Sequence, residues 1–383
     1  MMNINVIFLA FATFATGTAE NIIVGVLPDI ASGLGVSIAL AGQLTAVFSV
    51  AFALAAPLAL WLATRIERKK VFLGALVLFI ASNLFAAVSP NFASLFIARV
   101  GMGAASATIC LVGTTLATEM VRTEMKGRAI GVIFMGISGS LVLGVPIGMA
   151  FDEWFGWRSV FVGLASLTSL VLIASAFTLP VSYRRGKDPI GYLLHLRALP
   201  LVCAQLLSIL MIAGHFVVFA YLAPYAADVV GVPKPLIILC FIALGVAGVS
   251  GGYLGGWLSD VISPRSAILF TPLAYLTALA SIPLVVGVPW LAFMVMMVWS
   301  CISWMISPVV QSFLITTSPE TADTGVSLNF SAMHLGVGAG TAIGGLTTEK
   351  LSLLALPWSG TVLASLAVVS AITAVRRTHA GNK

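Results

Sequence analysis

Charged residues are scarce in this sequence. Asp, Glu, Lys and Arg make up 8% of the 383 residues, whereas hydrophobic residues make up 60% and the mean hydropathy is +1.10. A soluble globular domain contains about 25% charged residues, so water is not the main solvent of this chain. The sequence predicts a multi-pass membrane protein.

Several chemical signatures are also missing. The four cysteines (Cys110, Cys203, Cys240 and Cys301) have no metal-ligand spacing, and we expect neither a disulfide nor a metal site. The chain has no His-Glu-x-x-His, no Gly-x-Ser-x-Gly, no paired membrane aspartates and no ATP-binding loop. These absences argue against an intramembrane enzyme and against direct ATP coupling, and we predict no catalytic residue and no cofactor other than a proton gradient.

Long apolar runs dominate what is present. A helix needs about 20 apolar residues to cross about 30 Å of hydrocarbon, and the sequence contains about twelve such runs. We therefore predict an all-α membrane protein with twelve transmembrane helices. The expected spans are 4–27, 38–63, 71–88, 93–118, 128–151, 158–179, 199–227, 235–258, 265–286, 290–316, 323–347 and 355–375.

Basic residues indicate the orientation, because Lys and Arg are retained on the cytoplasmic side during insertion. If the number of spans is even, the Lys and Arg residues of the loops and tails fall on one side of the membrane, which is then the cytoplasmic side. The exceptions are Arg158, Lys234 and Lys350. Both termini are expected in the cytoplasm of a bacterial cell, with the chain in the inner membrane. The net charge of +6 is explained by this topology, so we predict no nucleic-acid partner.

The chain matches itself at a shift of 196 positions without a gap over five apolar spans. Pro28 aligns with Pro224 and Gly35 with Gly231, and the run Gly144-Val145-Pro146-Ile147-Gly148 aligns with the run 340–344. This repeat predicts two pseudo-symmetric six-helix bundles, at 1–182 and 198–383, joined by a cytoplasmic linker at 183–197. Parallel repeats of this kind are typical of secondary transporters with alternating access.

Two ionisable side chains lie deep in predicted spans. Glu20 is about eight residues short of the outer end of the first span, and Arg99 is about six residues inside the fourth. At about 1.5 Å per residue both lie roughly 10 Å below the outer surface, so they can form a pair or share an aqueous cavity. Because buried charges are costly in a membrane, we predict that Glu20 and Arg99 couple transport to protons; the alternatives are a static ion pair for Glu20 and helix-fixing bonds to carbonyl groups for Arg99.

Histidines, amides and aromatic rings supply candidate ligands for a substrate. His215 aligns with Ala19 in the repeat and should face the central cavity, and His334 is a second candidate. Amides that hydrogen-bond and rings that stack suit a flat, uncharged heteroaromatic solute, although helix packing explains the same composition. The predicted substrate-binding residues are Asn21, His215, Phe216, Tyr221, Trp304, Asn329 and His334.

Glycine-rich faces occur in the fifth and eleventh spans. Gly144 and Gly148 allow close approach between helices, and Pro146 predicts a kink because it removes one main-chain hydrogen bond.

These residues resemble the motifs of the major facilitator superfamily, and the resemblance covers essentially the whole chain. The run Gly256-Trp257-Leu258-Ser259-Asp260 with Arg265 is similar to the cytoplasmic loop motif, in which Asp260 would cap a neighbouring helix and pair with a basic residue to hold one gating state. In the first half this motif is degraded, with Leu60, Thr64 and Glu67 at the expected glycine, acid and second glycine. Arg99 with Gly101 and Gly103 resembles the fourth-helix arginine motif, which is associated with proton coupling.

Within the superfamily, the chain resembles the proton-coupled drug and metabolite efflux branch. The run at 144–148 is similar to the fifth-helix antiporter motif, and Thr18-Ala19-Glu20-Asn21 to the first-helix acidic motif. Gly214-His215-Phe216, Ser303-Trp304 and Ser327-Leu328-Asn329 are most similar to bacterial purine base and nucleoside efflux pumps. Arabinose-type sugar exporters and amphenicol or multidrug exporters share much of this frame.

The resemblance implies a monomeric proton antiporter that exports a small uncharged solute, with purines or nucleosides as the first candidates. Its expected partners are this solute, protons and the lipid bilayer. A channel or a receptor remains an alternative, although a repeated frame with a buried acid favours a carrier.

Overall fold

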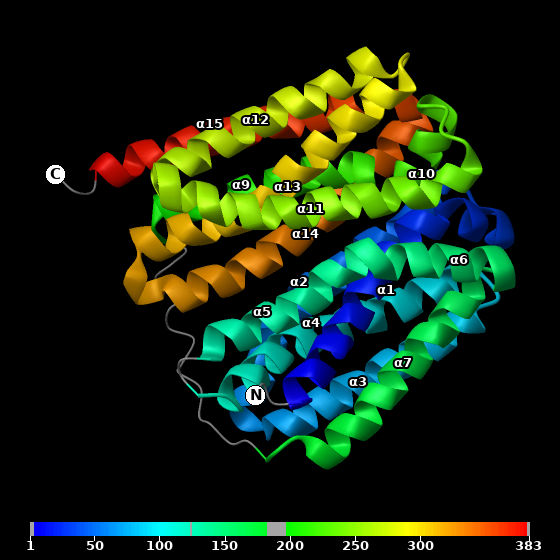
Figure 1. Cartoon of the computed structure of the whole chain (residues 1–383), viewed down its shortest axis with the longest axis vertical. Coiled ribbons are helices and arrows are strands. Elements are labelled where there is room, and N and C mark those ends of the chain that lie inside the picture. The colour runs from blue at the N-terminus through cyan, green and yellow to red at the C-terminus, as the bar shows by residue number, and fades with distance from the viewer. Residues whose placement is uncertain (1–3, 123–124, 182–196, 381–383) are drawn as a thin grey trace. The chain divides into compact units, whose positions relative to one another are not determined.

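A computed structural model describes residues 4–122, 125–181 and 197–380. The chain divides into two compact units, Met1–Lys187 and Asp188–Lys383, each of which is a bundle of helices (Figure 1). The predicted linker 183–197 lies outside the described residues except for Arg197, which is exposed.

Unit 1 contains six long helical segments, one of which is made of three pieces. Its elements are α1 (Ile4–Leu34), α2 (Ile38–Arg65), α3 (Arg68–Ala87), α4 (Phe92–Glu119), α5 (Lys126–Gly139), the π-helical turn η2 (Ser140–Gly144), α6 (Val145–Phe155) and α7 (Trp157–Thr178).

Unit 2 repeats this plan with different interruptions. Its elements are α9 (Leu199–Phe219), α10 (Leu222–Pro224), the π-helical turn η3 (Tyr225–Val229), α11 (Lys234–Ile262), α12 (Pro264–Val285), α13 (Pro289–Thr317), η4 (Pro319–Thr321), α14 (Ala322–Lys350), η5 (Leu353–Ala355) and α15 (Leu356–Ala380).

Eleven helical segments in the described part of the chain are long and apolar enough to cross a membrane. The expected span at 323–347 is the one of the twelve predicted spans that does not meet this criterion. It forms α14, a continuous helix of 29 residues, but glycine and polar residues such as Asn329 and Thr341 make it less apolar than the others. Both of these side chains are fully buried inside unit 2, so packing against neighbouring helices replaces contact with lipid.

The two units break their first helices at corresponding places. In α1 the backbone leaves helical geometry at Val26, two residues before Pro28, and in unit 2 it does so at Tyr221, three residues before Pro224. Gly35 and Gly231 follow with φ of 63° and 79°, a left-handed conformation that glycine adopts without steric cost. The two glycines match at a shift of 196 and share a backbone conformation as well as a residue type, and the two breaks lie within one position of each other at that shift.

The units also share their helix neighbours. The pairs α2 with α4, α3 with α4 and α3 with α7 in unit 1 correspond to α11 with α13, α12 with α13 and α12 with α15 in unit 2. In unit 1 the Thr13 hydroxyl donates to the carbonyl of Ile133 at 3.1 Å, and in unit 2 the Gln205 amide donates to the carbonyl of Gly325 at 2.9 Å. Both bonds join residues 120 positions apart, which indicates one helix-packing plan used twice.

The kink predicted at Pro146 takes the form of a π-helical turn just before the proline. The main-chain N–H of Val145 donates to the carbonyl of Ser140, five residues earlier, and Pro146 then occupies the first turn of α6. A proline is tolerated there because the first helical turn does not need its missing N–H.

Close helix approach in unit 2 depends on particular glycines of α11. A Cβ atom added to Gly255 would lie 2.6 Å from the carbonyl oxygen of Met305 and 2.8 Å from its Cα, whereas a Cβ at the neighbouring Gly256 would meet nothing within 4 Å. Gly255 therefore lets α11 reach the backbone of α13, and Gly256 does not take part in this contact.

We expect Gly255→Val to lower the thermal unfolding midpoint of the purified protein, because the added methyl groups force α11 away from α13 at a cost of about 1–3 kcal/mol. The matched variant Gly256→Val should unfold near the wild-type temperature. Equal midpoints for the two variants in detergent would contradict the packing described for α11 and α13.

Candidate functional site

Arg99 of α4 is fully buried and is held by the main chain of two other helices. Its Nε donates to the carbonyl of Leu44 in α2 at 2.9 Å, and its Nη1 donates to the carbonyl of Ala19 in α1 at 2.5 Å. Its Nη2 lies 3.4 Å from the carbonyl oxygen of Glu20, and the guanidinium lies 4.3 Å from the ring centroid of Phe48. Arg99 thus forms the bonds to carbonyl groups that were the alternative to a role in proton coupling. These bonds connect α4 to α1 and α2.

The Glu20 side chain is half-buried on α1 beside this arginine. Its carboxylate attracts the Arg99 guanidinium electrostatically and also acts on the Cys110 thiol of α4. The Cys110 sulfur lies 3.5 Å from the Thr16 hydroxyl, one helical turn before Glu20. Glu20, Arg99, Thr16 and Cys110 thus form one cluster between α1 and α4, which we call the acid cluster.

The neighbouring Asn21 is buried and only partly satisfied. Its Nδ2 donates to the carbonyl of Gly17 at 3.0 Å, while its Oδ1 has no hydrogen-bond partner among the described residues. A buried amide oxygen without a partner is costly, so Asn21 offers an unused acceptor next to the acid cluster.

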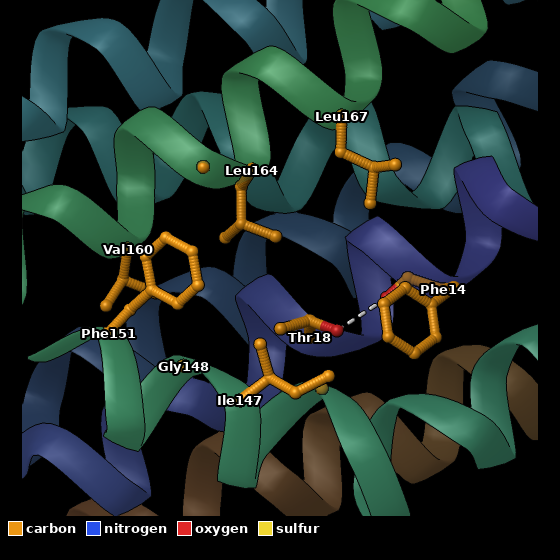
Figure 2. Close-up of a pocket in the computed structure, with 10 residues that line it drawn as sticks. Phe14, Thr18, Ile147, Gly148, Phe151, Val160, Leu164 and Leu167 are labelled. Carbon is orange, nitrogen blue, oxygen red and sulfur yellow. Dashed lines mark hydrogen bonds between the residues drawn. The ribbon is translucent and has the colours of Figure 1, made fainter.

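The glycines of the 144–148 run bring η2 and α6 against the same stretch of α1. A Cβ at Gly144 would collide with the Thr18 hydroxyl, and one at Gly148 would lie within 2.9 Å of Ile22 Cγ1. Thr18 and Ile22 are the residues two before and two after Glu20. Figure 2 labels Thr18 on α1 and Gly148 on α6, one residue from each of these two contacts. The run therefore fixes the part of α1 that carries the acid.

His215 lies at the centre of an aromatic cluster in unit 2. Its ring is stacked on Phe219 with centroids 4.9 Å apart, is tilted against Trp299 at 4.5 Å, and meets the edges of Phe216 and Trp304 at 5.3 and 6.0 Å. Neither ring nitrogen of His215 has a hydrogen-bond partner in the described part of the chain, and the residue is 1% exposed. We call these five residues the histidine cluster.

Trp304 is the half-buried member of the histidine cluster. Its indole lies against Gly248 of α11, where an added Cβ would be 2.7 Å from Trp304 Cδ1. The close approach of α11 at Gly248 therefore holds this ring beside His215.

Asn329 belongs to a buried polar network between α9 and α14. Its Nδ2 donates to Gln205 Oε1 at 3.0 Å and to the Ser208 hydroxyl at 2.8 Å, whereas its Oδ1 lacks a partner among the described residues. Through these two bonds Asn329 joins α14 to α9, and its Oδ1 remains available as an acceptor.

Tyr221 and His334 already bond to the protein. The Tyr221 hydroxyl donates to the carbonyl of Thr341 at 3.0 Å, and its ring packs on Gly344. The Nδ1 of His334, which is half-buried, lies 2.9 Å from the carbonyl oxygen of Phe330. Tyr221 thereby joins the break between α9 and α10 to α14, and His334 bonds within its own helix.

The loop motif residues of the two units differ in their ion pairs within the described residues. Asp260 and Arg265, at the ends of α11 and α12, are exposed, and neither forms an ion pair within the described residues. In unit 1, where the motif is degraded, Arg68 forms an ion pair with Glu119, and the Lys69 ammonium donates to the carbonyl of Leu179 at 2.7 Å. These contacts hold the start of α3 to the ends of α4 and α7.

Cys110 and Ser208 were not predicted to belong to any site. Cys110 was expected to be a packing residue, and Ser208 looks like an ordinary residue of an apolar helix. Only contacts between helices bring Cys110 beside Glu20 and Ser208 beside Asn329. No group of three His, Cys, Asp or Glu side chains in the described ranges could hold a metal ion.

Comparison with known proteins identifies the family. A model of the Major Facilitator Superfamily matches residues 9–341. The uncharacterized MFS-type transporter YbcL of Bacillus subtilis (strain 168) is 29% identical over 367 residues, which cover 95% of this chain and 94% of YbcL. The uncharacterized MFS-type transporter YtbD of the same organism is 27% identical over 372 residues, which cover 94% of this chain and 92% of YtbD.

Solved structures agree at the level of the fold. A D-xylose-proton symporter superposes with a TM-score of 0.80 at 16% identity, covering 96% of each chain. A bacterial homologue of the human lysosomal transporter Spinster, inward-facing and unoccupied, superposes with a TM-score of 0.78 at 18% identity, covering 98% of this chain and 96% of that one. The predicted all-α membrane fold is confirmed: the chain belongs to the Major Facilitator Superfamily and is a multi-pass membrane transporter.

Proposed function

We propose that this transporter exports a small uncharged solute in exchange for protons, and that purine bases or nucleosides are its substrates. The observation that carries the proposal is the acid cluster, in which a half-buried carboxyl of a membrane-spanning helix lies beside a fully buried arginine. Ionisable groups inside membrane spans are costly, and in transporters they mark proton and substrate pathways.

The bonding of Arg99 supports a titrating role for Glu20. The guanidinium donates to the main-chain carbonyl groups of Leu44 and Ala19, and neither bond involves the Glu20 carboxyl. Protonation of Glu20 therefore removes one electrostatic attraction but leaves the buried guanidinium with its hydrogen bonds. A buried ion that loses its only partner is strongly destabilising, and this arrangement avoids that cost. The carboxyl can change its charge while the helices remain joined.

The histidine cluster supports a flat heteroaromatic substrate. Rings at stacking distance provide a surface for a planar solute, and the two unpartnered nitrogens of His215 provide a donor and an acceptor in the neutral imidazole. In this structure four aromatic side chains surround the imidazole, so a solute reaches His215 only after one ring moves. Trp304, which is the half-buried one, is the ring that we expect to move.

In the proposed cycle, Glu20 is deprotonated while the solute is bound and takes up a proton from outside as the solute leaves. Protonation neutralises the acid and favours return to the inward-open state. The transporter acts as a monomer in the bacterial inner membrane, with both termini in the cytoplasm, and the proton gradient is its only energy source.

The alternatives are a multidrug or amphenicol exporter and an arabinose-like sugar exporter. A sugar has hydroxyl groups but no flat aromatic face, so the stacking surface around His215 favours purines. An efflux panel of purines, nucleosides, pentoses and phenicols in vesicles under an imposed pH gradient separates these substrates.

We expect Glu20→Gln in reconstituted vesicles to abolish transport driven by a pH gradient, because glutamine cannot carry the proton, while solute exchange without a gradient persists. Glu153→Gln, which removes an exposed carboxyl at the end of α6, is the matched control and should transport normally. If the Glu20→Gln protein still couples solute movement to the gradient, Glu20 is not the proton site.

We expect His215→Phe to weaken purine binding about tenfold, because it keeps the ring stack but removes a hydrogen bond worth about 1 kcal/mol or slightly more. His334→Phe, in which the replaced ring bonds to its own helix, should change the affinity much less. Equilibrium binding of a radiolabelled purine to the purified variants measures both effects, and equal losses would argue against a specific role for His215.

A further inference from the structure

Unit 1 contains a groove that the transport proposal does not use. It lies between α1, α6 and α7 and has a volume of about 140 Å³. Figure 2 shows Phe151 and Val160 at one end and Phe14 and Leu167 at the other, with Ile147 and Leu164 between them.

The groove offers no free hydrogen-bond donor. Thr18 is the one lining residue with a polar side chain, and its hydroxyl donates to the carbonyl of Phe14 at 2.8 Å. A solute that needs several hydrogen bonds finds only the acceptor oxygen of this hydroxyl here, whereas a hydrocarbon chain loses none. The lining selects for purely apolar matter and excludes the solute proposed for the histidine cluster.

Glycine creates the space. Gly163 of α7 lines the groove, and a Cβ added there would meet nothing within 4 Å. In unit 2 the residues that align with Phe151 and Gly163 at a shift of 196 are Thr347 and Ser359, whose hydroxyls lie 3.0 Å apart. A hydrogen bond therefore joins the helices of unit 2 at the position where unit 1 leaves a groove.

The position of the groove identifies the medium that fills it. The helices that line it are long and apolar enough to span a membrane, and Leu164 is seven residues from the start of α7, or about 10 Å along its axis. That depth lies within the hydrocarbon of a bilayer. Ile147 and Phe151, which line the groove, are 52% and 39% exposed, so the groove is open to its surroundings.

We propose that this groove binds a segment of one acyl chain of a membrane phospholipid. An apolar cavity of about 150 Å³ accommodates a molecule the size of benzene, so the groove holds several methylene groups and not a whole lipid. The chain rests against Thr18 and Gly148, at the contact that fixes the α1 segment carrying Glu20. A lipid bound there packs against the contact between α1 and α6.

Photo-crosslinking tests this proposal directly. The full-length protein is reconstituted in phosphatidylcholine that carries a diazirine along one acyl chain, irradiated and digested, and the adducts are located by mass spectrometry. We expect adducts at Ile147, Leu164 and Leu167, including Leu164 although it is only 5% exposed. Val171, a similarly buried residue of α7 outside the groove at 4% exposure, should carry none.

The decisive variant is Gly163→Leu, because a Cβ atom added at this lining position would meet nothing within 4 Å. We expect it to lower the groove adducts about fivefold, since leucine atoms take the positions that chain carbons would contact, and to leave adducts at Phe177, which is 86% exposed, unchanged. Gly74→Leu on α3, where an added Cβ also meets nothing within 4 Å, should change neither signal.

Two results would overturn the proposal. The first is an equal yield of groove adducts in wild type, Gly163→Leu and Gly74→Leu, which would show that these residues meet only bulk lipid. The second is labelling of Ile147 and Leu167 by a photoreactive purine in place of the lipid, which would assign the groove to the transported solute. Neither result bears on proton coupling by Glu20, which the vesicle assays measure separately.

Discussion

Internal partners for polar groups are the constraint on which this structure depends. Helices in hydrocarbon cannot leave donors or acceptors to water, so buried donors such as those of Arg99 and Asn329 bond to neighbouring helices. Arg99 donates to the main chains of α1 and α2, and Asn329 joins α14 to α9 through Gln205 and Ser208. These bonds fix the rotation and depth of each helix, and glycines such as Gly255 then determine how closely two helices approach.

The duplicated frame carries different chemistry in its two copies. The acid cluster occurs in unit 1, and the histidine cluster occurs in unit 2, where Phe216 stands at the position that aligns with Glu20. The helix neighbours, the broken first helix and the left-handed glycine are common to both copies. The repeat therefore preserves packing, while the residues proposed to bind the proton and the solute differ between the copies.

Much of the fold could be predicted from the sequence, because a run of about 20 apolar residues locates a membrane helix, although not always its end: the predicted span 4–27 is α1, which continues to Leu34. The predicted span 38–63 is α2 at Ile38–Arg65, and the predicted span 290–316 is α13 at Pro289–Thr317. The details of packing could not be predicted. Sequence pattern does not show that Gly255 contacts α13 while Gly256 faces open space, or that Cys110 lies beside Glu20, because these facts depend on helix rotation, which apolar composition hardly constrains.

The place of Glu20 along α1 has an electrical consequence. By the predicted topology Glu20 lies roughly 10 Å below the outer surface of a hydrocarbon layer about 30 Å thick, so a proton that reached it from outside would cross about a third of the membrane voltage. Moving one elementary charge across the whole membrane is worth about 2.3 kcal/mol per 100 mV, and a third of that is about 0.8 kcal/mol. Occupancy of the carboxyl by a proton would therefore respond to the membrane potential as well as to the pH on each side.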